Sequence, residues 1–165
     1  ESSQVGVLDG HEVVYVDRME SAHSLRLFTE TGRRVPVHCT SSGKVLLAYL
    51  PEVRRQAVLR AAPLEALTPH TITDRSQLAA ELDRVRRRGW AEAVNEREVG
   101  VASIAAPVRD IGGEVIAAIS IGVPLARCSV MALRRLAPVI MEAAEAASRR
   151  LGWSGDLSSQ QRKEG

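Results

Sequence analysis

The stretch Val101–Pro124, VASIAAPVRDIGGEVIAAISIGVP, consists of two runs of small and apolar residues joined by a turn. The runs cover Val101–Val108 and Val115–Val123, and between them lies Asp110-Ile111-Gly112-Gly113, whose residue types are typical of turns. Strands that are apolar on both faces are expected where a sheet is covered on both sides. The stretch therefore predicts a hairpin in the middle of a sheet.

A second hairpin is predicted near the N-terminus. Apolar residues alternate with others over Val5–Val7 and Val13–Tyr15, on either side of Asp9-Gly10, a strong hairpin signal. Three shorter strands are expected at Leu25–Phe28, Val35–His38 and Trp90–Val94. The middle one contains a proline, which is typical of an edge strand. Together these segments predict a mainly antiparallel sheet.

Helices are predicted between and after these strands. In the clearest of them, Asp74 and Gln77 have capping-box spacing, and Gly89 occupies the place of a C-terminal glycine stop. A long amphipathic helix is expected over Ser129–Leu151, and Pro138 inside it predicts a kink or a late start. The mixture of hairpins and helices predicts an α+β fold.

Length, charge and cysteine content limit the possible functions. A chain of 165 residues with a net charge of +2 is expected to form one domain with a sizeable core. The densest basic run, Arg84–Arg88, ends a predicted helix and has no interleaved aromatics, so it does not indicate nucleic-acid binding. Cys39 and Cys128 lie far apart, which favours reduced thiols. No apolar run approaches the roughly 18 residues of a membrane span. We therefore expect a cytoplasmic protein without a membrane partner.

Two groups of polar residues were candidates for other chemistry. His38 and Cys39 are adjacent, so on an extended segment they would point to opposite faces and make a poor pair of metal ligands. We predict no metal site and no cofactor. The cluster Glu96-Arg97-Glu98 has the alternating charges of a solvated segment, although such a loop could supply one polar contact to a pocket.

The segment Thr40–Ala48, TSSGKVLLA, allows three interpretations. A phosphate-binding P-loop is excluded, because His38 and Val45 occupy positions that require a glycine and a serine or threonine. Ser41 and Lys44 match the Ser-x-x-Lys spacing of acyl enzymes, but the partner motifs of those enzymes are absent. The third interpretation is a helix start, capped by Thr40 or Ser41, whose free N–H groups meet an anionic ligand while Lys44 points away.

Two stretches together resemble the C-terminal signature of the IclR family of bacterial transcriptional regulators. They are VPVHCTSSGKVLLAYLP, residues 35–51, and RRRGWAEAVNEREVGVASIAAPVRDIGGEVIAAISIGVP, residues 86–124. The resemblance runs from about Val5 to Leu151. It implies a GAF-like α+β domain over residues 1–152, with a curved, mainly antiparallel sheet flanked by helices. It also implies a flexible tail over residues 153–165 and a winged helix-turn-helix domain that this chain lacks.

The resemblance further implies a domain that binds a small effector, forms homodimers or homotetramers, and passes the signal to the absent DNA-binding domain. Family effectors are often small organic acids, and DNA contact would come only through that absent domain. Matching motif positions imply a pocket lined by Ser41, Ser42, Gly43, Glu98, Val101, Ser103 and Ser120. No catalysis is expected, and the alternative is a small acyl-transfer enzyme that uses Ser41 and Lys44 on the same fold. The chain departs from the family pattern at Ala93, where some members carry an acidic residue, and at Ser103, where cysteine is frequent.

Overall fold

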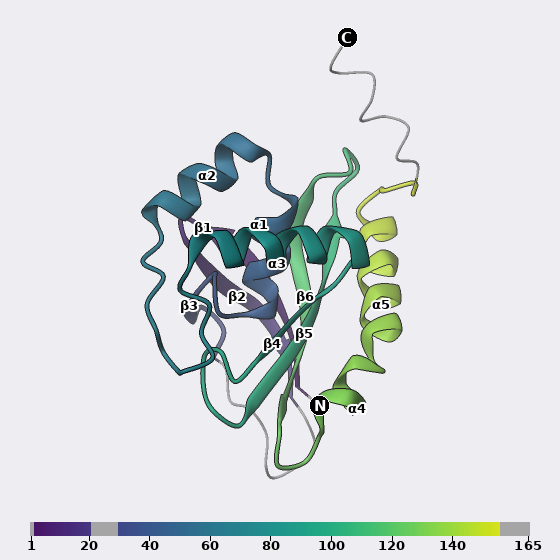
Figure 1. The fold of residues 1–165 in the computed structure, drawn as a ribbon. Coiled ribbons are helices and arrows are strands. Elements are labelled where there is room, and N and C mark those ends of the chain that lie inside the picture. Colours follow the sequence, from purple (N-terminus) through teal and green to yellow (C-terminus); the bar gives the residue numbers. More distant parts are fainter. Residues whose placement is uncertain (1, 21–29, 156–165) are drawn as a thin grey trace.

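The computed structural model describes residues 2–20 and 30–155, and its framework is one curved antiparallel sheet. Among the described residues, six strands are hydrogen-bonded in the order β3-β2-β1-β6-β5-β4 (Figure 1). Their bounds are β1 (Ser2–Asp9), β2 (Glu12–Met19), β3 (Arg34–Pro36), β4 (Ala91–Val94), β5 (Val101–Arg109) and β6 (Val115–Pro124). The predicted α+β fold with a curved, mainly antiparallel sheet is confirmed.

Both predicted hairpins are present. β5 pairs with β6 along its whole length, and β6 also pairs with β1, so the β5–β6 hairpin lies inside the sheet as predicted. At its turn, the Asp110 carboxylate accepts hydrogen bonds from the N–H groups of Gly112 (2.9 Å) and Glu114 (3.0 Å). The β1–β2 hairpin turns at Gly10, whose φ of 63° lies in the left-handed region that glycine tolerates.

The remaining predicted strands have different outcomes. β3 is an edge strand of three residues that includes Pro36, as its sequence predicted. β4 forms the opposite edge and pairs only with β5 among the described strands. The strand predicted at Leu25–Phe28 falls outside the described residues.

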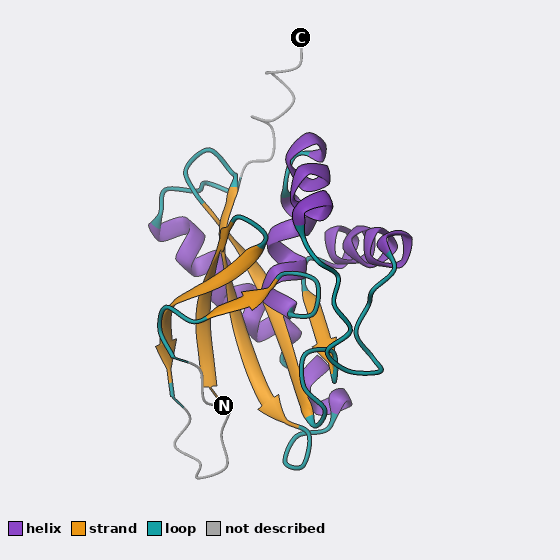
Figure 2. Ribbon diagram, turned by 90° about the vertical axis from the view of Figure 1, so that its left-hand side faces the viewer, coloured by secondary structure: helices purple, strands orange, loops and turns teal. Residues whose placement is uncertain are grey.

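The described residues form five helices, which lie on the two faces of the sheet (Figures 1 and 2). They are α1 (Ser41–Tyr49), α2 (Glu52–Ala61), α3 (Arg75–Arg88), α4 (Val130–Arg134) and α5 (Ala137–Arg150). α1 packs on β5 and β6 from one side and is covered by α3, whereas α5 packs on the other side of the same strands. None of the described helices has the length and apolar character needed to cross a membrane.

The helix ends follow the predicted chemistry, with one refinement at the C-terminus. Asp74 caps α3 by accepting a hydrogen bond from the N–H of Gln77, and Gly89 ends that helix with a φ of 83°. The single helix predicted over Ser129–Leu151 is divided into α4 and α5, and Pro138 lies in the first turn of α5. Pro138 thus acts as the late start that was one of its two predicted effects, because proline lacks the N–H that a helix interior needs.

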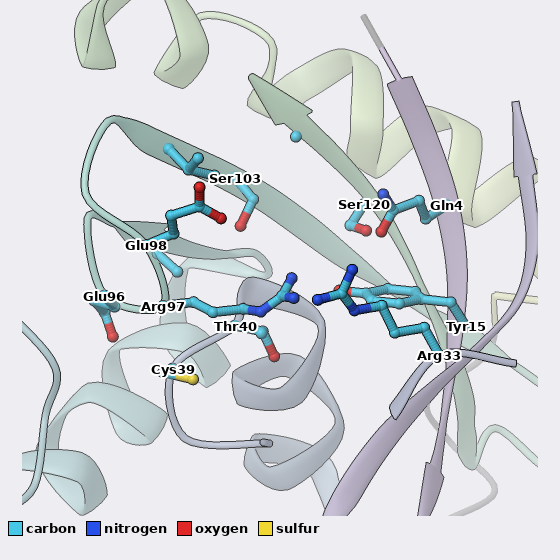
Figure 3. Close-up of a pocket in the computed structure, with 13 residues that line it drawn as sticks. Gln4, Tyr15, Arg33, Cys39, Thr40, Glu96, Arg97, Glu98, Ser103 and Ser120 are labelled. Carbon is cyan, nitrogen blue, oxygen red and sulfur yellow. The ribbon is translucent and has the colours of Figure 1, made fainter. Parts of the chain in front are cut away.

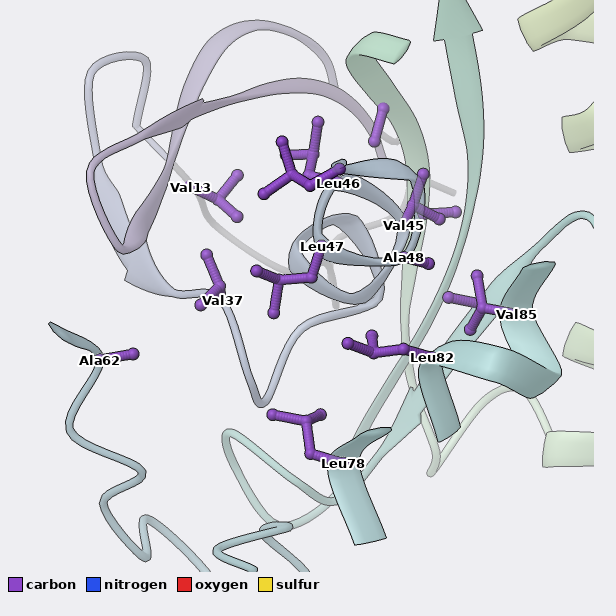
Figure 4. Packing of buried hydrophobic residues seen from close by; sticks show 14 of the residues in the cluster. Val13, Val37, Val45, Leu46, Leu47, Ala48, Ala62, Leu78, Leu82 and Val85 are labelled. Carbon is purple, nitrogen blue, oxygen red and sulfur yellow. The ribbon is translucent and has the colours of Figure 1, made fainter. Parts of the chain in front are cut away.

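α1 is the centre of the larger hydrophobic cluster (Figure 4). Val45 and Leu47 have 0% of their surface exposed, and they pack among residues of β2, of the segment before α1 and of α3. A helix enclosed on all sides cannot shift without disturbing several neighbours. The first turn of α1 is therefore held in a fixed place beside the sheet.

Candidate functional site

The first turn of α1 is fastened to the sheet by hydroxyl groups. Thr40 caps the helix, since its Oγ1 accepts a hydrogen bond from the N–H of Gly43 at 3.1 Å. The Ser41 hydroxyl donates to Ser103 Oγ of β5 at 2.8 Å. Gly43 lies against the backbone of Val37, and a Cβ atom there would be 2.1 Å from the Val37 carbonyl oxygen. The segment before α1 and the helix start thus form one closely packed unit.

A cavity of about 310 Å³ opens beside this helix start (Figure 3). It lies between the inner face of the sheet, the residues that precede α1 and the β4–β5 loop of residues 95–100. Most of its lining side chains are polar or charged, namely Gln4, Tyr15, Arg33, Thr40, Glu96, Arg97, Glu98, Ser103 and Ser120. Cys39, Ala93, Val101 and Gly122 complete the lining. Such a wall favours a small polar ligand over an apolar one.

Two guanidinium groups extend into the cavity. Arg33 comes from the turn before β3 and Arg97 from the β4–β5 loop, and their side chains point toward one another (Figure 3). Within residues 2–20 and 30–155, neither guanidinium forms an ion pair or a side-chain hydrogen bond. Burial raises the pKa of the Tyr15 phenol, and the charges of Arg97 and Arg33 oppose that rise. Both positive charges therefore act at the part of the cavity that Tyr15 lines.

The β4–β5 loop is anchored by a buried ion pair. Lys44 of α1 is 1% exposed and Glu96 is 8% exposed, and Lys44 Nζ lies 2.5 Å from Glu96 Oε1. The same ammonium donates to the Glu92 carbonyl oxygen at 3.0 Å. Burial raises the pKa of Glu96, and the ammonium of Lys44 opposes that rise. Glu96 Oε2 has no hydrogen-bond partner in the described part of the chain.

Two threonines hold the other side of the same loop. The hydroxyl of Thr68 donates to the Asn95 carbonyl oxygen at 2.5 Å, and that of Thr71 donates to the Glu96 carbonyl oxygen at 2.6 Å. Asn95 adopts a positive φ of 57°, and its side chain accepts a hydrogen bond from the N–H of Gly100 at 2.7 Å. The loop that carries Arg97 is thus fixed from both sides.

Comparison with known proteins identifies the family to which this fold belongs. A family model described as the bacterial transcriptional regulator IclR C-terminal domain matches residues 1–149. The chain belongs to the IclR family. The family resemblance seen in the sequence is therefore confirmed.

Individual IclR-family relatives agree in sequence and in structure. The transcriptional regulator KdgR of Dickeya chrysanthemi is 39% identical over 129 residues, which cover 78% of this chain and 42% of the relative. The crystal structure of Thermotoga maritima IclR matches with a TM-score of 0.86 and 33% identity, over 93% of this chain and 62% of that one. The inducer-binding domain of a PobR double mutant from Acinetobacter, in complex with 3-hydroxybenzoic acid, matches with a TM-score of 0.80 and 32% identity, over 89% and 87%. The chain spans about half the length of the curated relatives it matches.

The seven residues predicted for the pocket of this IclR-family domain divide into two groups. Four of them line the cavity: Glu98, Val101, Ser103 and Ser120. The other three, Ser41, Ser42 and Gly43, are buried in the first turn of α1 and are not among the lining residues. Ser41 reaches the lining only through its hydrogen bond to Ser103. Direct contact between a ligand and any of the seven stays a prediction.

The structure corrects one expectation about charged residues. Glu96 was predicted to be solvated, but it is buried because Lys44 supplies a counter-charge at the inner end of the loop. Lys44 is enclosed between α1 and this loop, and its expected direction away from the helix start stays a prediction. The Ser41 hydroxyl donates a hydrogen bond to Ser103, and Lys44 Nζ donates one to Glu96, so these two residues do not form a nucleophile and base pair. The relatives are named as transcriptional regulators, which also argues against the alternative of a small enzyme.

Several lining residues were not predicted. Gln4 and Tyr15 face the cavity from β1 and β2. Each lies two residues from an inner-face residue, Gly6 or Val13, and that spacing was a usable signal because residues i and i+2 of a strand share a face. Cys39 also lines the cavity, where burial raises the pKa of its thiol to about 11 and keeps it protonated. Groups of three or more metal-ligating side chains do not occur among the described residues.

Proposed function

We propose that this chain is the effector-binding domain of an IclR-type bacterial transcriptional regulator and that its cavity binds a small organic acid. The observation that carries the proposal is the pair of guanidinium groups, Arg33 and Arg97, which face a small cavity without an anionic partner among the described residues. Arginine binds carboxylates through two parallel hydrogen bonds, which are stronger than bonds between neutral groups.

The remaining lining supports a small polar acid. The hydroxyls of Tyr15, Ser103 and Ser120 and the amide of Gln4 can bond to oxygen atoms along a ligand. A cavity of about 310 Å³ is at the small end of ligand pockets, whose volumes run from roughly 300 to 1,000 Å³. The PobR domain of similar fold was solved with 3-hydroxybenzoic acid, itself a small organic acid.

The basic run at the end of α3 does not supply a nucleic-acid surface in this proposal. Arg86 donates to the carbonyl oxygens of Ala48 and Leu50, where it stabilises the C-terminal end of α1. Arg88 pairs with Glu81 and stacks on Trp90, with its guanidinium carbon 4.2 Å from the ring centroid. DNA recognition is therefore assigned to a domain outside this chain, which receives the ligand signal from here.

A thermal-shift screen tests the ligand class directly. We expect small carboxylic acids to raise the melting temperature of the 165-residue chain and their primary amides to leave it unchanged. A ligand that binds only the folded state at a hundredfold excess over its Kd adds about 2.7 kcal/mol, or roughly 5–10 °C for a domain of this size. If the amides raised the melting temperature as much as the acids did, the proposal that the cavity binds an anion would be wrong.

We further propose that the domain self-associates into dimers or tetramers. Apolar side chains of β2, β6 and α5 are open to solvent, including Val16 (47% exposed), Ile116 (44%) and Val139 (57%). Light scattering at micromolar concentration should give a mass of at least twice that of one chain. A monomer at that concentration would assign assembly to other parts of the full protein.

A further inference from the structure

We propose that the ligand carries two acidic groups, one bound by Arg33 and one by Arg97, so that the domain selects a small dicarboxylate over a monocarboxylate. This inference rests on the proposed function, because it concerns the same cavity and the same class of ligand. Beyond that function, it specifies how many acidic groups the ligand carries and which two residues bind them.

The two guanidinium groups belong to walls that face each other. Arg33 is carried by the turn next to β3, at one end of the sheet, and Arg97 by the loop that leads from β4, at the other end. Their side chains converge between Tyr15 and Thr40 (Figure 3). Two like charges that converge in a partly enclosed space repel each other, and a bound anion offsets that repulsion. The fold places this repulsion where a ligand would sit.

The acidic residues of the cavity do not neutralise these two arginines. Glu96 is already paired with Lys44, and the two charges of that pair cancel. Glu98 is exposed at the rim and bonds to neither guanidinium, so water and salt screen its charge. Within the described part of the chain, both arginines are thus available to a ligand.

The shape of a guanidinium explains why two acids suit this cavity better than one. Each group presents a planar fork of donors that one carboxylate fills. A monocarboxylate would fill the donors of one guanidinium. The second guanidinium would then lose water that the ligand displaces and gain no anion in return. A dicarboxylate satisfies both forks and balances both charges.

The polar lining next to the two arginines is suited to the middle of such a ligand. Ser103 and Ser120 present hydroxyls from neighbouring strands, and Gln4 presents an amide. The cavity of about 310 Å³ favours a short chain between the acids.

Calorimetric titration of the 165-residue chain with matched ligand pairs tests the inference. The probes are succinate, glutarate and adipate, each compared with its own monomethyl ester, which keeps one acid and loses the other. We expect the best diacid to bind at least about tenfold more tightly than its ester. Arg33→Gln and Arg97→Gln should each weaken the diacid to about the affinity that the ester has for the unaltered chain.

Arg34→Gln is the matched control. Arg34 is the exposed neighbour of Arg33, it pairs with Asp9 and Glu12, and it does not line the cavity. Its substitution should leave both affinities unchanged. An effect of the same size in Arg34→Gln and Arg33→Gln would overturn the assignment, since it would indicate a general loss of positive charge.

The outcomes separate this inference from the function on which it rests. Esters that bind as tightly as their diacids would overturn the two-acid inference and leave a single-acid sensor. Failure of every acid and ester to bind would overturn both. The comparison of diacid with ester uses the unaltered chain, so it decides the matter even if one arginine variant fails to fold.

Discussion

Gly43→Ala is expected to lower the free energy of unfolding by about 3 kcal/mol, at the upper end of the usual cost of overpacking. The added Cβ would lie 2.1 Å from the carbonyl oxygen and 2.5 Å from the Cα of Val37, and backbone atoms cannot move aside as a flexible side chain can. Helix propensity alone predicts the opposite sign, because alanine is favoured over glycine within a helix by roughly 0.5–1 kcal/mol. Urea denaturation followed by circular dichroism measures the difference.

Gly112→Ala is the control for that measurement. Gly112 lies in the β5–β6 turn, where a Cβ would come no closer than 3.3 Å, and its nearest neighbour is the side chain of Asp110. The control should change stability by less than about 1 kcal/mol. If the Gly43→Ala variant were as stable as the Gly112→Ala variant, the close packing of α1 against the backbone of Val37 would be contradicted.

Lys44→Met is expected to cost about 3–5 kcal/mol at neutral pH, because it leaves the Glu96 carboxylate buried without its counter-charge. Methionine keeps much of the volume of lysine, so the loss reports the charge more than a cavity. Arg149→Met removes an exposed ion pair with Glu145 and serves as the control, with an expected cost below about 0.5 kcal/mol.

The pH dependence identifies the cause of the Lys44→Met loss. Burial raises the pKa of Glu96, and removing Lys44 removes the charge that opposes this rise. A carboxyl whose pKa is raised in the folded state stabilises the fold below its unfolded pKa and loses that contribution as pH rises through the folded pKa. The deficit should therefore be larger at pH 8 than at pH 5. An equal deficit at both pH values would instead indicate that lost packing is the cause. The double variant Lys44→Met/Glu96→Leu also removes the buried carboxylate, so it should recover most of the lost stability.

The parts of the fold that were predictable depend on local chemistry. The turn at Asp9-Gly10, the cap at Asp74 and the stop at Gly89 are each specified by residues a few positions apart. Pro138 allowed a kink or a late start, and only the packing of α5 on the sheet decided between them. Local signals therefore predicted the elements, whereas their packing required the structure.

The candidate site was less predictable because its groups meet across long separations. Lys44 and Glu96 are 52 residues apart, and the alternating charges around Arg97 are equally typical of a solvated loop. Arg33 lies in a turn, where no periodicity indicates which way a side chain points. Ser103 and Ser120, in contrast, were found because the family motif fixes their positions in the strands.

The two edge strands of the sheet, β3 and β4, limit how copies of this domain can associate. β3 has three residues, including a proline, and β4 has four, including Glu92, which is held by Arg134. Short, charged or proline-containing margins are poor templates for another strand. Main-chain pairing from one molecule to the next, the route to fibres, is thus disfavoured at both ends. Association of copies would instead have to use side chains on the helix and sheet faces.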